Sequence, residues 1–110
     1  MLCHTNILVT IGITVYNEGE YILEAWDSVL KQTDDRWNAV MIMDSNADKK
    51  TKIYFDSIQH PKLTKFTFLE NQGPYVARTK AIELTQTKWY CHLDGDDLLP
   101  NNMVHDITRV

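Results

Sequence analysis

The sequence predicts an α/β fold, with a mostly parallel sheet and helices that flank it. Apolar, β-branched runs alternate with helical patterns three times along the 110 residues, and this alternation is typical of parallel sheets with right-handed crossovers. Acidic residues follow three of the apolar runs. In a parallel sheet these acids share the carboxyl edge, which is where open α/β sheets bind ligands. Hydrophobic residues make up 44% of the chain and charged residues 24%, so a folded globular domain is expected.

The first half of the chain contains two strand candidates with a helix between them. Residues 7–15 (I-L-V-T-I-G-I-T-V) and 37–43 (W-N-A-V-M-I-M) are nearly continuous apolar runs, which suit central strands covered on both faces. Residues 20–32 carry apolar positions three and four apart, and this spacing predicts a helix. Its expected buried stripe consists of Tyr21, Ile22, Ala25, Trp26, Val29 and Leu30.

The middle of the chain repeats the pattern more weakly. Residues 49–59 predict a second helix in which Ile53, Phe55 and Ile58 are partly periodic, and Pro61 stops it. Residues 65–69 alternate between apolar and polar, as in a strand near a sheet edge.

The last third contains a helix, a strand and the start of another helix. Pro74 suits the first turn of a helix over residues 75–87. A fourth apolar run over residues 89–93 predicts a buried strand. Pro100 then begins what we expect to be a further helix.

The fourth apolar run is followed at once by Asp94, Asp96 and Asp97. Three neighbouring carboxylates repel one another, and a divalent cation would relieve the repulsion. Hard carboxylate oxygens suit Mg²⁺ or Mn²⁺, and magnesium is typically held by one or two carboxylates together with substrate phosphates. Gly95 would let the backbone approach a ligand. The stretch therefore predicts a metal-bridged phosphate or nucleotide site, with a solvated turn or helix cap as the alternative.

Two further acids support the site prediction. Glu18 follows the first predicted strand and Asp44 follows the second. With the acids after the fourth run, three independent loops would converge on one edge of the sheet. This convergence favours a nucleotide site over a solvated loop.

Charge and composition exclude several classes of partner. The net charge is −4, the isoelectric point is about 5.4 and no basic patch is present, so nucleic acid is not expected as a partner. No run of apolar residues is long enough to predict a transmembrane segment. Cys3 and Cys91 have no metal-like spacing, and we expect free thiols in a reducing compartment. These features predict a cytoplasmic protein, or one peripheral to the inner face of the membrane.

The four histidines are given no functional role. His4, His60, His92 and His105 lack the spacing of metal ligands. His92, a residue of the fourth predicted strand, is expected to be packed.

Three ordered blocks resemble the family 2 glycosyltransferases, an inverting group with the GT-A fold. Residues 13–18 (I-T-V-Y-N-E) and 28–33 (S-V-L-K-Q-T) are similar to the family's first block. Residues 41–48 (M-I-M-D-S-N-A-D) are similar to its V-D-D-G-S-x-D block. Residues 71–84 (N-Q-G-P-Y-V-A-R-T-K-A-I-E-L), followed by 93–97 (L-D-G-D-D), resemble the block that ends in the D-x-D signature. The resemblance spans almost the whole chain and implies the Rossmann-like nucleotide-binding half of a GT-A enzyme.

The resemblance implies a role for each matching residue at the base. Tyr16 would stack on or flank the nucleobase, and Thr14 and Glu18 would line the same pocket. Asp44 would hydrogen-bond the base edge. Each role has a simpler alternative, because Tyr16 also fits a partly buried aromatic residue and Asp44 a turn residue.

The resemblance also implies roles on the phosphate side. Arg78, with Lys80, would lie near the base or the phosphates, although Arg78 also fits a surface helix position. Asp94 would approach the ribose. Asp96 would hold Mn²⁺ or Mg²⁺, which would stabilise the charge on the leaving nucleoside diphosphate.

Some residues depart from the family pattern. Thr14 stands where the family usually has Pro, and Thr79 stands where it has Asn. Met43 replaces the first acid of the D-D pair. Counting from Asn17 places Asp44 at the second acid, whereas a slip of one residue would place Ser45 there.

The resemblance implies sugar transfer from a nucleotide-diphosphate sugar, with UDP-sugar favoured over GDP-sugar, to a hydroxyl of a saccharide or lipid-linked acceptor. Polysaccharide biosynthesis is a common setting for the family. Inversion needs a general base, and we assign none here because the family's base lies in a later, acceptor-binding half. We expect residues 1–110 to form a single nucleotide-sugar-binding domain without that half, which binds nucleotide and metal but transfers sugar poorly. An uncovered sheet face or edge would also favour a homo-oligomer.

Two other classes of protein remain open at this point. A nucleotidyltransferase would carry a glycine-rich phosphate loop and a basic residue after the first strand, and residues 16–19 (Y-N-E-G) have neither. A non-catalytic α/β interaction module of the receiver type would need an acid pair after that strand, which Glu18 matches poorly.

Overall fold

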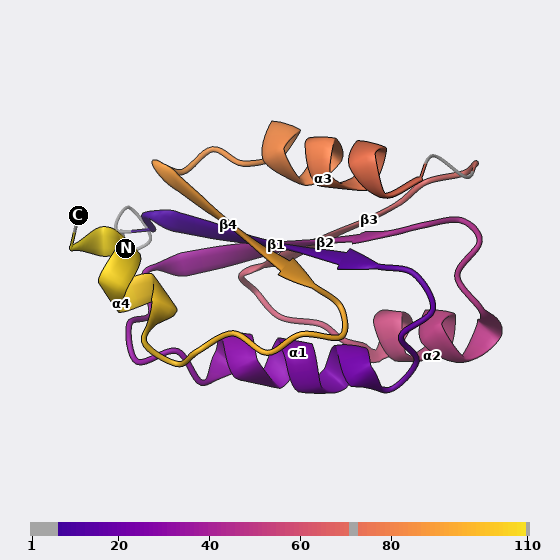
Figure 1. Cartoon of the computed structure of the whole chain (residues 1–110), viewed down its shortest axis with the longest axis horizontal. Coiled ribbons are helices and arrows are strands. Elements are labelled where there is room, and N and C mark those ends of the chain that lie inside the picture. Colours follow the sequence, from indigo (N-terminus) through magenta and orange to yellow (C-terminus); the bar gives the residue numbers. More distant parts are fainter. Residues whose placement is uncertain (1–6, 71–72, 110) are drawn as a thin grey trace.

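A computed structural model describes residues 7–70 and 73–109 and confirms the α/β fold (Figure 1). The described strands form one parallel sheet with the order β3-β2-β1-β4. The strands are β1 (Val9–Val15), β2 (Trp37–Met43), β3 (Leu63–Thr67) and β4 (Trp89–Asp94). The expected parallel topology follows from the three crossover helices between consecutive strands.

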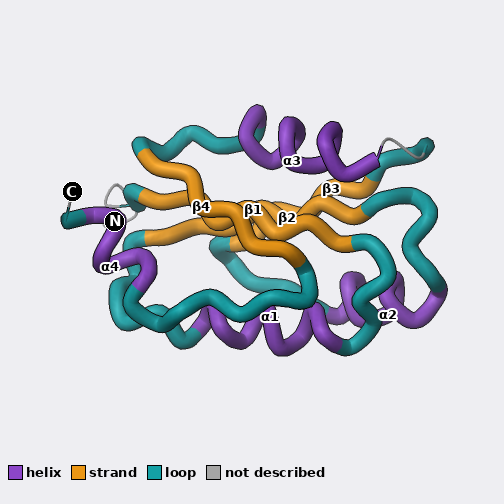
Figure 2. Tube along the Cα trace, in the orientation of Figure 1, coloured by secondary structure: helices purple, strands orange, loops and turns teal. Residues whose placement is uncertain are grey.

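Helices cover both faces of the sheet (Figures 1 and 2). One face carries α1 (Tyr21–Leu30), α2 (Lys49–Ser57) and α4 (Met103–Thr108), and the other carries α3 (Gly73–Glu83). In the described part of the chain, no helix is long and apolar enough to cross a membrane.

The pleat of the strands divides the apolar residues between two cores. The odd-numbered residues of β1, from Val9 to Val15, are fully buried in the larger core with α1, α2 and α4. On the opposite face, Val40 and Ile42 of β2 pack with Ala77 and Ala81 of α3. Small residues at these two helix positions let α3 lie close to the sheet.

Several predicted boundaries in the sheet were wrong. The third strand spans Leu63–Thr67 rather than residues 65–69, because pairing with β2 begins opposite Ala39. Leu69, which the alternation placed in this strand, is 97% exposed. The fourth strand runs one residue further than predicted and includes Asp94, which pairs with Thr14.

The predicted helices were too long at their ends. The second helix ends at Ser57, since Ile58 has an extended backbone, and the third spans Gly73–Glu83 rather than residues 75–87. The last helix begins at Met103, after Pro100. On the predicted stripes, Tyr21, Leu30 and Ile53 are exposed. Predictions that concern Cys3, Asn71 and Gln72 fall outside the described residues.

Two polar residues of the first helical segment anchor the chain that follows β4. The Ser28 hydroxyl accepts a hydrogen bond from the Leu99 amide at 2.9 Å. The Gln32 side chain donates to the Pro100 carbonyl at 2.6 Å and accepts from the Val104 amide at 3.0 Å. The loop that contains the acids is therefore tied to α1 at its far end.

We expect Gln32→Ala to lower the free energy of unfolding. Gln32 is 9% exposed, and its loss leaves the Pro100 carbonyl and the Val104 amide without this partner, at a cost of about 1–3 kcal/mol for such a group. Urea unfolding of both chains measures the difference, and Gln59→Ala at an exposed position is the matched control. Equal effects of the two substitutions would contradict an anchoring role for Gln32.

Candidate functional site

The candidate site lies at the carboxyl edge of the sheet, where β1 and β4 end side by side. Thr14 and Asp94 are register partners in the two strands. The buried Thr14 hydroxyl donates to Asp94 Oδ1 at 3.3 Å. Topology thus places two predicted site residues in direct contact.

Asp94 has two further partners. His92 Nε2 lies 2.9 Å from Asp94 Oδ1, and Arg78 Nη2 of α3 lies 3.7 Å from the same oxygen. The His92 hydrogen bond, with contributions from Arg78 and Thr14, lowers the pKa of Asp94. The Arg78–Asp94 pair adds little stability because both side chains are about half exposed.

Tyr16 lies under α3 next to the other site residues. Its ring is partly buried against the smaller core. Its hydroxyl oxygen is buried and has no hydrogen-bond partner among the described residues. Burial raises the pKa of Tyr16, and the nearby Asp44 and Glu18 carboxylates raise it further. The Asp44 carboxylate is therefore near enough to act on the Tyr16 hydroxyl, and a shared pocket for a nucleobase stays a prediction.

Asp44 is buried just after β2. Its Oδ1 accepts a hydrogen bond from the Asn46 amide at 2.8 Å, and its carbonyl accepts from the Ala47 amide at 3.2 Å. These contacts make Asp44 a turn residue as well as a candidate for contact with a base. The neighbouring Ser45 is half-buried, and its role at the base stays an alternative prediction.

Glu18 folds back over the end of β1. Its Oε1 accepts from the Tyr16 amide at 2.6 Å. Burial raises the pKa of Glu18, and the charges of Asp96 and Asp94 raise it further. These electrostatic effects locate Glu18 among the acids that follow β4.

The close packing around residue 95 requires a glycine there, for a reason that the sequence did not show. A Cβ at this position would lie 2.9 Å from the Thr14 carbonyl oxygen and 3.1 Å from Glu18 Cδ. The Gly95 amide donates to that same carbonyl at 2.9 Å. Glycine here lets the loop after β4 pack directly on the loop after β1, and approach of the backbone to a ligand stays a prediction.

A hollow of about 530 Å³ lies beside these loops and is lined by Asn17, Glu18, Tyr21 and Asp96. The Glu18 and Asp96 carboxylates supply hard oxygen ligands that fit Mg²⁺ or Mn²⁺. No group of three or more metal-ligating side chains occurs within residues 7–70 and 73–109. A cation here would therefore need oxygen atoms from a ligand to complete its coordination.

The loop after β1 is fixed against the start of α2. Asp48 caps this helix by accepting from the Thr51 amide at 2.8 Å, and its own amide donates to Asn17 Oδ1 at 2.8 Å. The Gly19 amide donates to the Thr51 hydroxyl at 2.9 Å, with Gly19 at φ +61°, a conformation that glycine adopts without steric cost. Glu18 is thus held between two anchored neighbours.

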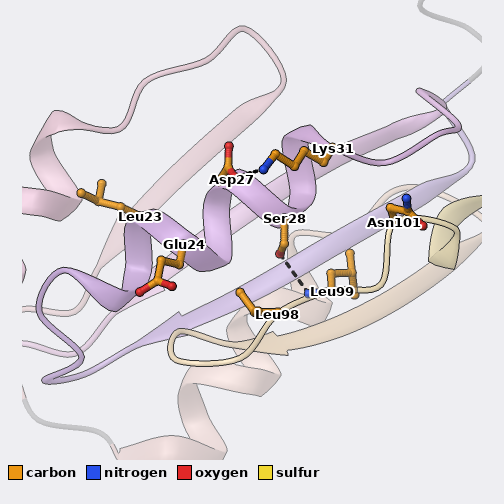
Figure 3. A pocket seen from close by; sticks show the side chains of 8 residues that line it. All are labelled: Leu23, Glu24, Asp27, Ser28, Lys31, Leu98, Leu99 and Asn101. Atoms are coloured by element: carbon orange, nitrogen blue, oxygen red, sulfur yellow. Dashed lines mark hydrogen bonds and ion pairs between the residues drawn. The ribbon is translucent and has the colours of Figure 1, made fainter.

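A second hollow, of about 570 Å³, lies away from these acids between α1 and the chain after β4 (Figure 3). Leu23, Leu98 and Leu99 line it. Three of its polar side chains are used within the protein, as Ser28 bonds the Leu99 amide and Asp27 pairs with Lys31 at 2.8 Å, and Glu24 is the one lining carboxylate without such a partner among the described residues. The hollow that contains Asp96 is therefore the better candidate site.

Sequence reasoning missed two residues of the site. His92, expected only to be packed, bonds Asp94, and Tyr90 bonds His92 at 3.1 Å. Counting back from Asp94 in steps of two along the strand would have found both. Lys80, by contrast, lies 4.6 Å over the Phe66 ring, as a packed residue of α3.

Residues 10–109 match the family model described as Glycosyl transferase family 2. The teichoic acid poly(glycerol phosphate) polymerase of Staphylococcus epidermidis is 33% identical over 93 residues, which cover 83% of this chain and 13% of the polymerase. Across eight curated relatives, the chain spans between 13% and 38% of the relative's length.

Two solved structures share the fold. S. aureus TarS 1-349 in complex with UDP has a TM-score of 0.80 at 21% identity, over 93% of this chain and 31% of that one. The mannosyltransferase PcManGT from Pyrobaculum calidifontis in complex with GDP-Man and Mn²⁺ has a TM-score of 0.69 at 25% identity, over 84% of this chain and 28% of that one. Both likenesses confirm the α/β architecture.

The raised pKa of Glu18 gives a pH-dependent prediction. A carboxyl group whose pKa is raised on folding stabilises the fold when protonated, and this stabilisation is lost as the pH rises through the folded-state pKa. We therefore expect Glu18→Gln to be more stable than the wild type at pH 7. The gain should shrink as the pH falls through the raised pKa of Glu18, because the carboxyl group itself then becomes protonated.

Thermal unfolding at a series of pH values measures this effect. Glu24→Gln, at an exposed position of α1, is the matched control and should show no such gain. A Glu18→Gln chain that is less stable than the wild type at pH 7 would refute the prediction.

Proposed function

This chain belongs to glycosyl transferase family 2, and we propose that it binds the nucleoside diphosphate of a nucleotide sugar, with UDP-sugar favoured, for inverting transfer of the sugar to an acceptor hydroxyl. The observation that supports this most is the convergence of three loops at one edge of the parallel sheet. They bring together Thr14, Tyr16, Glu18, Asp44, Asp94 and Asp96, with Arg78 above them on α3. Such an edge is the general ligand site of open α/β sheets.

The nucleoside would bind between the ends of β1 and β2. Tyr16 offers an aromatic face beside the Asp44 carboxylate, and this pair suits a base that is stacked and hydrogen-bonded at its edge. Asp94, a charged and half-exposed acceptor, suits a ribose hydroxyl. The two solved structures are complexes with UDP and with GDP-Man, which agrees with this class of ligand.

The diphosphate would lie over the hollow next to Asp96. Asp96 is exposed there and would hold Mn²⁺ or Mg²⁺, with Glu18 near it. The metal would supply Lewis-acid stabilisation of the charge on the leaving diphosphate. Arg78 would add a positive charge on the same side.

We assign no general base within these residues. Inverting transfer needs a carboxylate that deprotonates the acceptor hydroxyl, and the carboxylates of the candidate site are already given to the nucleotide and the metal. We therefore propose that these residues bind nucleotide and metal, and that sugar transfer by them alone is slow. The acceptor would be a saccharide or lipid-linked saccharide in polysaccharide biosynthesis.

Calorimetric titration of UDP and of GDP, each with and without Mn²⁺, tests the proposal. We expect binding that depends on Mn²⁺, because Asp96 and the diphosphate together complete the coordination of the metal. Asp96→Asn should remove the metal dependence, whereas Asp97→Asn, at the exposed neighbouring acid, should retain it.

Mn²⁺ without nucleotide should bind much more weakly than Mn²⁺ with UDP. If the wild type binds neither diphosphate under any of these conditions, the proposed function is wrong for this chain. Equal losses in the two variants would show that only the overall negative charge matters.

A further inference from the structure

The even-numbered side chains of β4 form a row on the α3 face of the sheet. The Tyr90 hydroxyl lies 3.1 Å from His92 Nδ1, and His92 Nε2 lies 2.9 Å from Asp94 Oδ1. The three residues alternate along one strand, so the pleat alone places them in line. The row ends at the acid that faces the candidate nucleotide site.

The chemistry of the three groups fixes the direction of their hydrogen bonds. The carboxylate of Asp94 only accepts, so His92 Nε2 carries a proton and donates to it. In the neutral imidazole, Nδ1 then accepts, and its partner is the Tyr90 hydroxyl. Burial raises the pKa of Tyr90 to about 12, so that this hydroxyl stays protonated and donates.

The neighbouring strand leaves room for the row. Gly12 is the register partner of His92 in β1. A Cβ at Gly12 would lie only 2.6 Å from Cε1 of the Tyr90 ring. Any larger residue at this position would displace Tyr90, so glycine at position 12 is what allows the Tyr90 ring to lie next to His92.

The side-chain contacts of Asp94 are made by one of its two carboxylate oxygens. His92, Thr14 and Arg78 all approach Oδ1. The Asp94 side chain is nevertheless 46% exposed. Among residues 7–70 and 73–109, Oδ2 is therefore the oxygen that is left to accept a hydrogen bond from a ligand.

We propose that Tyr90 and His92 are positioning residues that hold Asp94 in one orientation, so that Oδ2 accepts a hydrogen bond from a ribose hydroxyl of the bound nucleotide. The inference rests on the proposed function, since it names how this nucleotide site is held in shape. Tyr90 fixes the His92 tautomer, His92 fixes the carboxylate, and neither touches the nucleotide. Partners that orient a ligand-binding group in this way typically contribute 10–100-fold to affinity or activity.

The test measures the affinity of the 110-residue chain for UDP and for 2′,3′-dideoxy-UDP, both with Mn²⁺. Wild type should prefer UDP, because only UDP offers the ribose hydroxyls. His92→Phe keeps a planar ring but loses the donor, and should lower UDP affinity about 10–100-fold while leaving dideoxy-UDP affinity nearly unchanged. His92→Gln keeps a side-chain N–H donor and should recover most of the preference.

Two controls separate positioning from general stability. His105→Phe makes the same substitution at an exposed histidine of α4 and should leave both affinities unchanged. Nitrogen-15 spectra of the imidazole at neutral pH should show the Nε2-protonated tautomer of His92 in the wild type. In Tyr90→Phe the spectra should show a mixture of tautomers, because the donor to Nδ1 is gone.

Two results would overturn this inference and leave the proposed function standing. One is a His92→Phe chain that retains the preference for UDP, and the other is an Nδ1-protonated His92 in the wild type. A wild type that binds both nucleotides equally would mean that Asp94 does not meet the ribose. Failure of the wild type to bind either nucleotide would instead refute the proposed function, and the inference with it.

Discussion

The pairing of β1 with a parallel strand on each side is the constraint on which the rest of the structure depends. It sets Thr14 opposite Ile42 of β2 and opposite Asp94 of β4. Because side chains alternate with a period of two, a slip of one residue in β4 would turn His92 and Asp94 toward the larger core. Trp89, Cys91 and Leu93 of β4 pack in the larger core and oppose such a slip, so the burial of apolar side chains on one face of the strand fixes the polar row on the other.

The acids after β4 depend on α1 as well as on the sheet. The loop leaves the last strand at Asp94, and its backbone bonds join Gly95 to Thr14, Asp97 to Asp94 and Asn101 to Thr33. Its far end is held by the Ser28 and Gln32 side chains. Ser28 and Gln32 therefore help to hold Asp96, the acid that we propose binds the metal, although they contact the loop at its other end.

The sequence predicted the fold and brought the candidate residues to one edge of the sheet, and it failed where tertiary contacts decide. The central strands were readable because both of their faces are buried. The edge strand β3 was displaced by two residues, since its start depends on pairing opposite Ala39 rather than on its own alternation, whereas β4 at the other edge was displaced only at its end. His92 looked like a packing residue because nothing in a linear pattern shows that its ring reaches Asp94. The sequence also did not show that a side chain at Gly95 would meet Glu18 and the Thr14 carbonyl, and the predicted approach of a ligand there stays untested.

The acids after β4 repel one another less than their spacing in the sequence suggests, and this repulsion was the first reason to predict a metal. The charge of Asp94 is compensated by the His92 hydrogen bond, with Thr14 and Arg78 near it, and the pKa of Asp94 is lowered. Glu18 is in the opposite situation, because its burial and the nearby acids raise its pKa. Within the described part of the chain, Glu18 and Asp96 are the two carboxylates that line the hollow. Two carboxylates are too few to hold a hard divalent cation that prefers six oxygen ligands. In the proposed function the diphosphate supplies the missing oxygens, so metal and nucleotide must bind together, and the chain's own carboxylates set where they meet.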